Sequence, residues 1–179
     1  MRSIGTAICY RPMKTGEEAR VVSLVLKVFS EFVAPGYSKE GVAEFKKFVC
    51  TDALADRFRA GNLVLLAESG QRTIGVIEMR ENSHIALLFV EKAFQREGIA
   101  RELFRRSLEI CRKRKPDIQR ITVNSSPNAF TAYQKIGFKG IEDEKVKNGI
   151  RFISMELILD NNDSSQPLNS AAPKDRAAD

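Results

Sequence analysis

The sequence predicts a single-domain α/β fold in which a mixed, mostly antiparallel central sheet is flanked by helices. The length of 179 residues suits one domain with a substantial core. Up to about residue 60 the apolar residues recur at helical spacing, and from Leu63 onward they lie in short runs bounded by turn residues. The second half then alternates helix, strand, helix and strand, a succession typical of α/β domains. No repeat of about 20 to 50 residues is visible, which excludes solenoids and propellers.

The N-terminal third predicts one strand and three helical segments. Residues 6–13 alternate loosely as a strand and end at a proline and a polar turn. Residues 22–32 carry an apolar stripe at helical spacing, which stops at Ala34-Pro35-Gly36. Ser38 is a good N-cap for a second amphipathic helix up to Val49, and a short helical segment follows over residues 52–59.

The middle of the chain predicts three consecutive antiparallel strands. These cover residues 63–67, 73–80 and 84–90, and they are separated by short polar turns of the kind that joins hairpins.

The remaining elements complete the α/β pattern. A helix over residues 98–114 is followed, after a Pro-Asp turn, by a strand over residues 119–123. Residues 139–141 and 150–159 predict the two last strands. Residues 160–179 are rich in Asn, Ser, Pro, Ala and charge, so we expect a disordered tail after a domain of residues 1–159.

Composition is that of an ordinary globular protein, with 43% hydrophobic and 29% charged residues. No apolar run approaches the roughly 20 residues of a membrane span, and the first residues lack the apolar segment of a secretory signal. We therefore expect a cytoplasmic protein that does not engage a membrane. Cys9, Cys50 and Cys111 form no C-x-x-C pair, so we expect neither a disulfide framework nor a metal site.

A six-residue turn carries the first functional signal. Residues 95–100 read Q-R-E-G-I-A and lie between the strand that ends at Val90 and the helix that begins near Gly98. A glycine here lets the backbone approach an anion, and the start of the helix points unpaired N–H groups and the positive end of its dipole toward it. The turn therefore predicts a phosphate-binding site, although glycine at such a turn is also common for structural reasons alone.

A second motif agrees with the first in order and spacing. Residues 126–138 read S-P-N-A-F-T-A-Y-Q-K-I-G-F, which is similar to the signature N-x-x-A-x-x-x-Y-x-K-x-G-F. Together the two motifs resemble the GNAT superfamily of N-acetyltransferases, over about residues 10–159. One position departs from the signature: Ser126 stands where the family often has Asn. A serine can still cap the following helix, which Gly137 is expected to end in a left-handed turn.

The resemblance implies acetyl-coenzyme A as co-substrate and direct transfer of its acetyl group to an amine. The backbone N–H groups of residues 96–101 would hold the pyrophosphate, and the strand edge at residues 88–90 would pair with the amide-rich pantetheine arm. A backbone amide near Phe89 would polarise the thioester carbonyl. The expected cofactor-binding residues are Leu88, Phe89, Val90, Gln95, Arg96, Glu97, Gly98, Ile99, Ala100, Arg101 and Ser126.

Tyr133 is the expected general acid, because it matches the family's frequent tyrosine and a phenol with an ordinary pKa of about 10 is protonated at neutral pH. The general base stays open between Glu78 and His84. Glu78 points away from its apolar strand neighbours, and His84 is the only histidine of the chain. Removal of the proton through ordered water, without a single base, is a third alternative.

The acceptor is expected to be an amine on a small molecule or a peptide. In the family the early helices shape the acceptor pocket, so the aromatic residues of this region are either core or pocket wall, with core favoured for most. They are Phe29, Phe32, Tyr37, Phe45, Phe48 and Phe58. Transfer of longer acyl groups depends on pocket depth, and a homodimer is common for the fold.

Two other functions compete with this interpretation. The net charge of +6 would suit a nucleic-acid binder, but much of it lies at residues 105–115, toward a helix end where cations favour the dipole. No strand interleaves aromatic and basic residues, which argues against nucleic acid. A module that binds coenzyme A without catalysis is the second alternative, and the presence of Tyr133 argues against it. The glycine motifs of nicotinamide and ATP enzymes are absent from the sequence.

Overall fold

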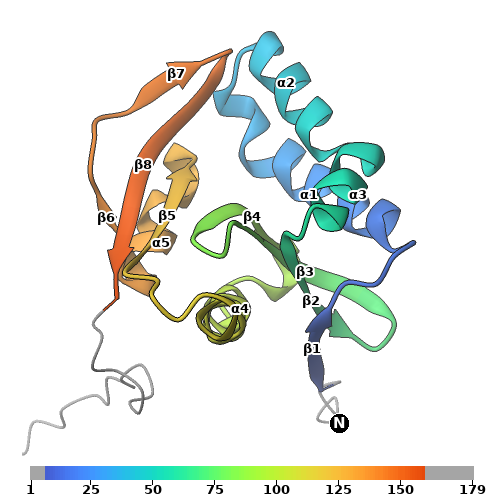
Figure 1. Ribbon diagram of the computed structural model, residues 1–179. Coiled ribbons are helices and arrows are strands. Elements are labelled where there is room, and N and C mark those ends of the chain that lie inside the picture. The colour runs from blue at the N-terminus through green and yellow to red at the C-terminus, as the bar shows by residue number, and fades with distance from the viewer. Residues whose placement is uncertain (1–6, 160–179) are drawn as a thin grey trace, which may run out of the picture.

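The computed structural model describes residues 7–159, in which a central sheet carries helices on both faces (Figure 1). The strands are β1 (Ile8–Pro12), β2 (Leu63–Ser69), β3 (Arg72–Arg80), β4 (His84–Val90), β5 (Arg120–Ser125), β6 (Lys139–Gly140), β7 (Lys145–Lys147) and β8 (Ile150–Ile158). The helices are α1 (Glu18–Phe32), α2 (Lys39–Val49), α3 (Thr51–Arg59), α4 (Ile99–Arg114) and α5 (Phe130–Ile136). Three short 3-10 turns are η1 (Ala34–Gly36), η2 (Lys92–Phe94) and η3 (Pro127–Ala129). The expected tail of residues 160–179 lies outside the described residues.

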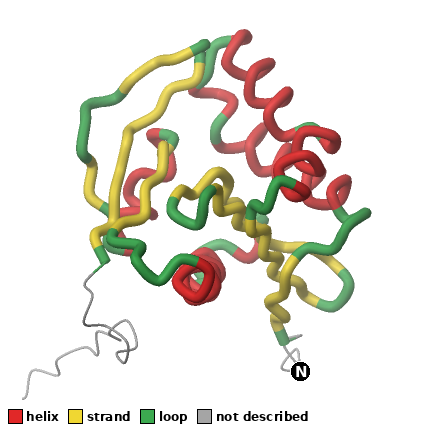
Figure 2. The backbone as a smooth tube through the Cα atoms, in the orientation of Figure 1, coloured by secondary structure: helices red, strands yellow, loops and turns green. Residues whose placement is uncertain are grey.

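The sheet has the order β1-β2-β3-β4-β5-β8-β6, with β7 paired to β8. Only the pairing of β4 with β5 is parallel among the described strands, and α4 provides the crossover between them. The α/β class and the mostly antiparallel sheet expected from the sequence are therefore confirmed. Figure 2 shows α1, α2 and α3 on one side of the central strands and α4 on the other. Helix α5 belongs to the α4 side, because Tyr133 of α5 and Phe104 of α4 share one core cluster.

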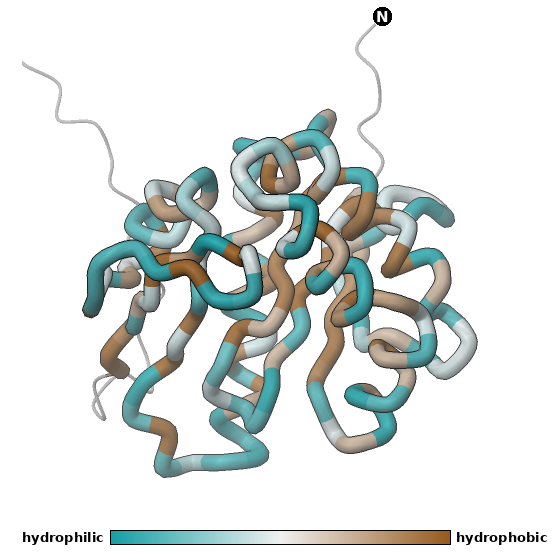
Figure 3. Tube along the Cα trace, turned by 90° about the horizontal axis from the view of Figure 1, so that it is seen from above, coloured by the Kyte–Doolittle hydropathy of each residue, from teal (hydrophilic) through white to brown (hydrophobic). Residues whose placement is uncertain are grey.

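Two apolar clusters bury the two faces of the sheet. On the α4–α5 face, Phe104 packs edge-on against Phe138 with ring centroids 5.4 Å apart. On the α1–α3 face, Phe29 stacks on Phe45 at 3.9 Å. Strand β2 is buried on both faces, which explains why residues 63–67 form a continuous apolar run. Figure 3 shows the same arrangement, with hydrophobic positions concentrated along the central strands and hydrophilic ones in the outer loops.

Local signals in the sequence place most of the boundaries. The side chain of Ser38 accepts a hydrogen bond from the Gly41 N–H, as expected of an N-cap. Gly137 ends α5 with φ of +113°, the left-handed conformation expected there.

One expectation about local structure is wrong, and one strand was not predicted. Ser126 makes no side-chain cap, because η3 intervenes and α5 begins only at Phe130. The short strand β7 was not expected, because it has three residues and its valine, Val146, is exposed. Pairing with β8, rather than its own apolar pattern, defines this strand. Within residues 7–159, no helix combines the length and the apolar character needed to cross a membrane.

Candidate active site at the β4–β5 fork

The two parallel strands at the centre of the sheet separate soon after they meet. Strands β4 and β5 pair only through His84 with Thr122 and Ile85 with Val123. Strand β4 nevertheless stays paired with β3 as far as Val90, and β5 stays paired with β8 as far as Ser125. The register of β3 and β4 shifts after Glu78, and such a bulge bends a strand. We call the separated stretches, residues 86–90 of β4 and 124–125 of β5, the fork. Its two facing edges carry backbone groups that do not pair with each other.

A row of unbonded backbone N–H groups lies just beyond the end of β4. Glu102 is the first residue of α4 whose N–H donates within the helix, to the carbonyl oxygen of Gly98. In the described part of the chain, the N–H groups of residues 96–101 have neither a backbone nor a side-chain acceptor. A helix start with unpaired N–H groups and a positive dipole end attracts anions.

The backbone of this turn has the conformation of an anion-binding concavity. Arg96 and Gly98 have positive φ angles of 65° and 81°, and Glu97 between them does not. Such alternation makes successive N–H groups converge on one side of the chain. A Cβ built on Gly98 would meet nothing within 4 Å, so the space beside it is open. Such a row of donors suits an anionic group, and the exposed guanidinium of Arg101, hydrogen-bonded to the carbonyl oxygen of Lys135, adds positive charge.

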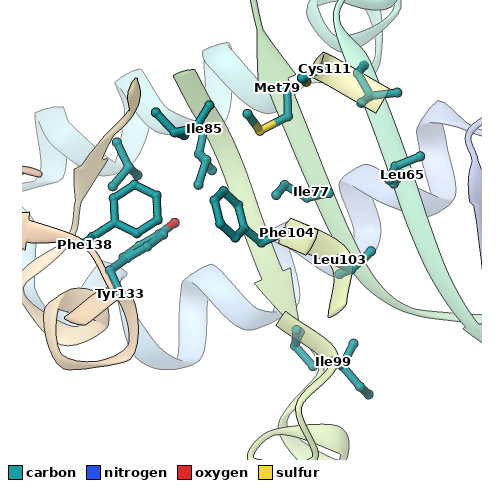
Figure 4. Packing of buried hydrophobic residues seen from close by; sticks show 14 of the residues in the cluster. Leu65, Ile77, Met79, Ile85, Ile99, Leu103, Phe104, Cys111, Tyr133 and Phe138 are labelled. Atoms are coloured by element: carbon teal, nitrogen blue, oxygen red, sulfur yellow. The ribbon is translucent and has the colours of Figure 1, made fainter. Parts of the chain in front are cut away.

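Tyr133 projects from α5 into the core beneath the fork. The residue is 7% exposed, and its ring packs edge-on against that of Phe138 with the ring centroids 5.5 Å apart. Figure 4 shows its hydroxyl oxygen pointing away from α5, toward Phe104 and the strand that carries Ile85. Within the described residues this hydroxyl makes no hydrogen bond. Burial raises the pKa of the Tyr133 phenol well above its ordinary value, so the group is protonated at neutral pH.

Glu78 lies on the other face of the sheet, the face covered by α1, α2 and α3. Its side chain is fully buried and accepts hydrogen bonds from Arg57 Nε at 2.7 Å and Arg57 Nη2 at 3.0 Å. Asn62 Nδ2 donates to the same carboxylate at 2.7 Å. These donors compensate the burial of the charge. The carboxylate thus joins β3 to α3, an arrangement that no local pattern in the sequence indicated.

His84 stands where β4 and β5 are still paired, at the closed end of the fork. Its Nδ1 lies 2.8 Å from Oγ1 of Thr122. Burial lowers the pKa of the His84 imidazole below its ordinary value, the nearby Arg80 lowers it further, and Glu81 opposes the change. The imidazole is therefore neutral at pH 7 and able to accept a proton.

A polar row that was not predicted from the sequence continues from His84 across β5 and β8. Thr122 lies opposite Glu156, and Asn124 lies opposite Ser154 with 3.4 Å between the Ser154 hydroxyl and the Asn124 side-chain oxygen. The residues between them, among them Ile121, Val123 and Met155, face the opposite, apolar side. The alternation of apolar and polar residues in β5 and β8 carried this signal, but only the pairing register brings the two strands' polar residues together.

The early aromatic residues divide between core and surface. Phe29 is fully buried, whereas Phe48 is exposed and the other four are half-buried. Among these, Phe45 bridges α2 to β4, with its ring 3.9 Å from that of Phe29 and 6.0 Å from that of Phe89. Phe45 and Phe89 therefore contribute an aromatic surface on the α1–α3 side of β4.

Two hollows of the surface lie away from the fork. One, of about 530 Å³, lies beside the loop between β6 and β7, and the other, of about 330 Å³, lies between α1 and β3. Neither is lined by the separated stretches of β4 and β5. Among residues 7–159, no group of three or more His, Cys, Asp or Glu side chains is arranged to hold a metal ion.

Comparison with known proteins agrees with this geometry. The family model described as an acetyltransferase (GNAT) domain matches residues 33–159. No curated protein sequence matches the chain.

Solved structures with the same architecture share little sequence. A GCN5-related N-acetyltransferase from Rhodopseudomonas palustris has a TM-score of 0.74 at 19% identity, over 89% of this chain and 100% of that one. The PaiA N-acetyltransferase from Thermoplasma acidophilum, solved with coenzyme A, has a TM-score of 0.70 at 19% identity, over 86% and 99%. An acetyltransferase of the GNAT family from Staphylococcus aureus has a TM-score of 0.67 at 15% identity, over 86% and 100%. At these identities the likeness concerns the fold.

Proposed function

The chain belongs to the GNAT acetyltransferase family, and on this premise we propose that it transfers the acetyl group of acetyl-coenzyme A directly to a primary amine. One observation carries the proposal: unbonded backbone N–H groups at residues 96–101 stand beside a sheet that opens at the fork. The coenzyme A bound to the Thermoplasma protein of similar fold supports the choice of co-substrate.

The backbone does most of the binding. The N–H groups of residues 96–101 hold the pyrophosphate, with Gln95 at the start of the turn and the α4 dipole behind it. The free edge of β4 at residues 88–90 pairs with the amides of the pantetheine arm, as an added strand would. Ser126 lies at the end of β5, where its hydroxyl can reach the same arm. A backbone amide near Phe89 donates to the thioester carbonyl oxygen and stabilises the charge that develops there.

When bound, acetyl-coenzyme A supplies a thioester whose carbonyl carbon accepts the amine nitrogen and whose sulfur leaves. A nitrogen–carbon bond forms as the carbon–sulfur bond breaks. The protein must take one proton from the amine and give one to the departing sulfur.

Tyr133 gives the proton to sulfur. Its phenol is protonated because burial raises its pKa. A thiol has an ordinary pKa of about 8.5, and the same apolar surroundings raise the pKa of the departing thiol as well. The pKa values of the Tyr133 phenol and of the thiol therefore lie closer together than if burial raised that of the phenol alone. The absence of any hydrogen bond to the hydroxyl within the described residues leaves its proton available.

His84 is our first candidate to take the proton from the amine, directly or through water. The Thr122 hydroxyl lies 3.5 Å from the carbonyl oxygen of Ser83 and donates toward it, so its own oxygen accepts from Nδ1–H of His84. Nε2 is then the basic nitrogen. Glu78 stays a second candidate, although Arg57 and Asn62 already donate to its oxygens.

The test is release of free coenzyme A, followed with a thiol reagent, in the presence of acetyl-coenzyme A and a panel of primary amines. The expected result is turnover that depends on the amine and yields the acetylated amine by mass spectrometry. A thermal shift with acetyl-coenzyme A accompanies the assay. A shift without turnover on any amine would replace the transferase by a module that only binds coenzyme A, and no shift would remove the co-substrate as well.

A further inference from the structure

The elements around the fork form a closed ring on the α1–α3 side. Helix α1 packs on β4, α2 contacts β8, β8 pairs with β5, and β5 pairs with β4. In Figure 1 the ring can be followed from β4 through α1 and α2 to β8, and back through β5. The cofactor-binding turn and α5 lie on the opposite side of the sheet, whereas on the side within the ring Asn124 of β5 is exposed to solvent.

Two glycines close the ring where α2 meets the turn between β7 and β8. A Cβ on Gly41 would lie 2.1 Å from the carbonyl oxygen of Gly149, and a Cβ on Gly149 would lie 2.2 Å from Oγ of Ser38. Side chains do not approach other atoms so closely, so the contact exists because both residues are glycine. Gly149 also has φ of +75°, a conformation that glycine adopts without strain.

Two side chains connect the segment between α1 and α2 to the β5–β8 side of the fork. Asn128, which follows β5, donates from its amide to the carbonyl oxygen of Phe32 at the end of α1. Arg151 of β8 donates to the carbonyl oxygen of Gly36 at 3.4 Å. Residues 32–41 thus contact β8 through Arg151, the β7–β8 turn through Gly149, and the segment that follows β5 through Asn128.

The inside of the ring offers oxygen acceptors and aromatic surface. The polar row contributes the side chains of Thr122, Asn124 and Ser154, and β4 and α2 contribute the half-buried rings of Phe89 and Phe45. An ammonium group finds hydrogen-bond acceptors on one side and aromatic faces on the other.

From the ring we infer that the acceptor is a narrow primary amine that enters end-on, and that lysines on the surface of folded proteins are not substrates. The inference rests on the proposed amine acetylation. A folded protein brings its lysine together with the surface around it, and that surface meets α2 and the β7–β8 turn. An amine at the end of a slender molecule passes inside them.

The experiment compares acceptors with the full-length chain. Small alkyl and arylalkyl amines, a short peptide with a free α-amino group, and folded ubiquitin as a lysine-bearing protein are each assayed with acetyl-coenzyme A. The expected result is a kcat/KM for the best small amine or the peptide about 100-fold or more above that for ubiquitin. The small amines and the peptide are assayed separately, so their kcat/KM values show which of these two classes supplies the acceptor amine.

Variants test whether the ring is the cause. Gly41→Ala cannot keep the contact with Gly149, so it should raise the KM for small amines about tenfold and improve ubiquitin relative to them. Lys39→Ala, an exposed position in the same first turn of α2, should change neither. If Gly41→Ala does not fold, Asn128→Ala removes the hydrogen bond to the carbonyl oxygen of Phe32 without adding atoms. It should also raise the kcat/KM for ubiquitin relative to that for small amines.

The outcomes separate the two proposals. Acetylation of folded ubiquitin as fast as of small amines by the wild type overturns the ring inference and leaves the amine transferase standing. Variants whose acceptor ratio equals that of the wild type also overturn it. Failure to acetylate any amine overturns the transferase and the inference together.

Discussion

His84 and Thr122 are directly opposite each other in the two-residue ladder that joins β4 to β5, and their side chains meet with 2.8 Å between Nδ1 and Oγ1. The only histidine of the chain is therefore held at the point from which the two strands diverge. A neutral imidazole at this point, with its ring orientation fixed by a hydroxyl, has the properties of a general base near neutral pH.

The pH dependence of activity and stability should report on His84. Because burial and Arg80 lower the pKa of His84 in the folded protein, the acid limb of kcat/KM should lie below the ordinary histidine value of about 6.5. His84→Gln should lower kcat/KM about 100-fold and remove this limb. An unchanged profile would exclude His84 as the base and move attention to Glu78 or water.

The same shift has a consequence for folding. Below about pH 6.5 the unfolded chain binds a proton at His84 before the folded protein does, so the free energy of unfolding falls as the pH falls from 6.5 toward the folded-state pKa. Denaturant titrations of the wild type and of His84→Gln between about pH 5 and 8 would show whether this pH dependence of the free energy of unfolding requires His84. The contribution of His84 to the free energy of unfolding is fully present above the pKa that the residue has in the unfolded chain. It is lost as the pH falls through the folded-state pKa.

Tyr133→Phe should lower kcat about 100-fold or more with little change in stability. The substitution removes the hydroxyl but keeps the ring that packs against Phe138. Steady-state kinetics and thermal unfolding of the variant test both parts. Tyr10→Phe is the matched control, because Tyr10 lies on the edge strand β1 beside Arg106. Full activity of Tyr133→Phe would leave the departing sulfur to be protonated by solvent.

Gly98→Ala should raise the Kd for coenzyme A about tenfold or more. A side chain at φ of +81° is strained by about 1–2 kcal/mol, and the new methyl group occupies the open space beside the N–H groups. Gly70→Ala has comparable strain, with φ of +62° and equally open surroundings, but it lies in the β2–β3 turn. Isothermal titration should therefore show weaker binding for Gly98→Ala alone, whereas both variants lose similar stability. A Kd for coenzyme A that is the same in Gly98→Ala as in Gly70→Ala and the wild type would contradict the phosphate-binding role of the turn.

Arg57→Ala should destabilise the fold by about 3–5 kcal/mol, because it leaves the fully buried Glu78 carboxylate without its charged partner. Arg59→Ala, two residues along α3, breaks an exposed pair with Asp56 and should cost less than about 1 kcal/mol. Urea denaturation of both variants at pH 7 measures the contrast. Similar losses for the two arginines would mean that Glu78 is solvated and free for chemistry.

The sequence predicted the skeleton of the fold because its signals are local. The helical stripe of α1, the cap at Ser38 and the left-handed glycine at Gly137 depend on neighbours within a few residues. The signal for the turn at residues 95–100 is equally local, so the sequence alone predicted unpaired N–H groups at the start of α4. Strand β7 was not predicted, because its local signal is weak. The cap expected at Ser126 was wrong, because a 3-10 turn intervenes before α5.

What the sequence determined by itself was the α/β class, the order of most elements and the family, since periodicity, turn residues and two motifs carry this information along the chain. Only the tertiary structure decided that β4 and β5 part after two residues, that His84 meets Thr122, and that Gly41 meets Gly149. These contacts join residues far apart in the chain, and they depend on sheet register and helix packing. No single stretch of sequence specifies such quantities, because they follow from how all the buried faces fit together.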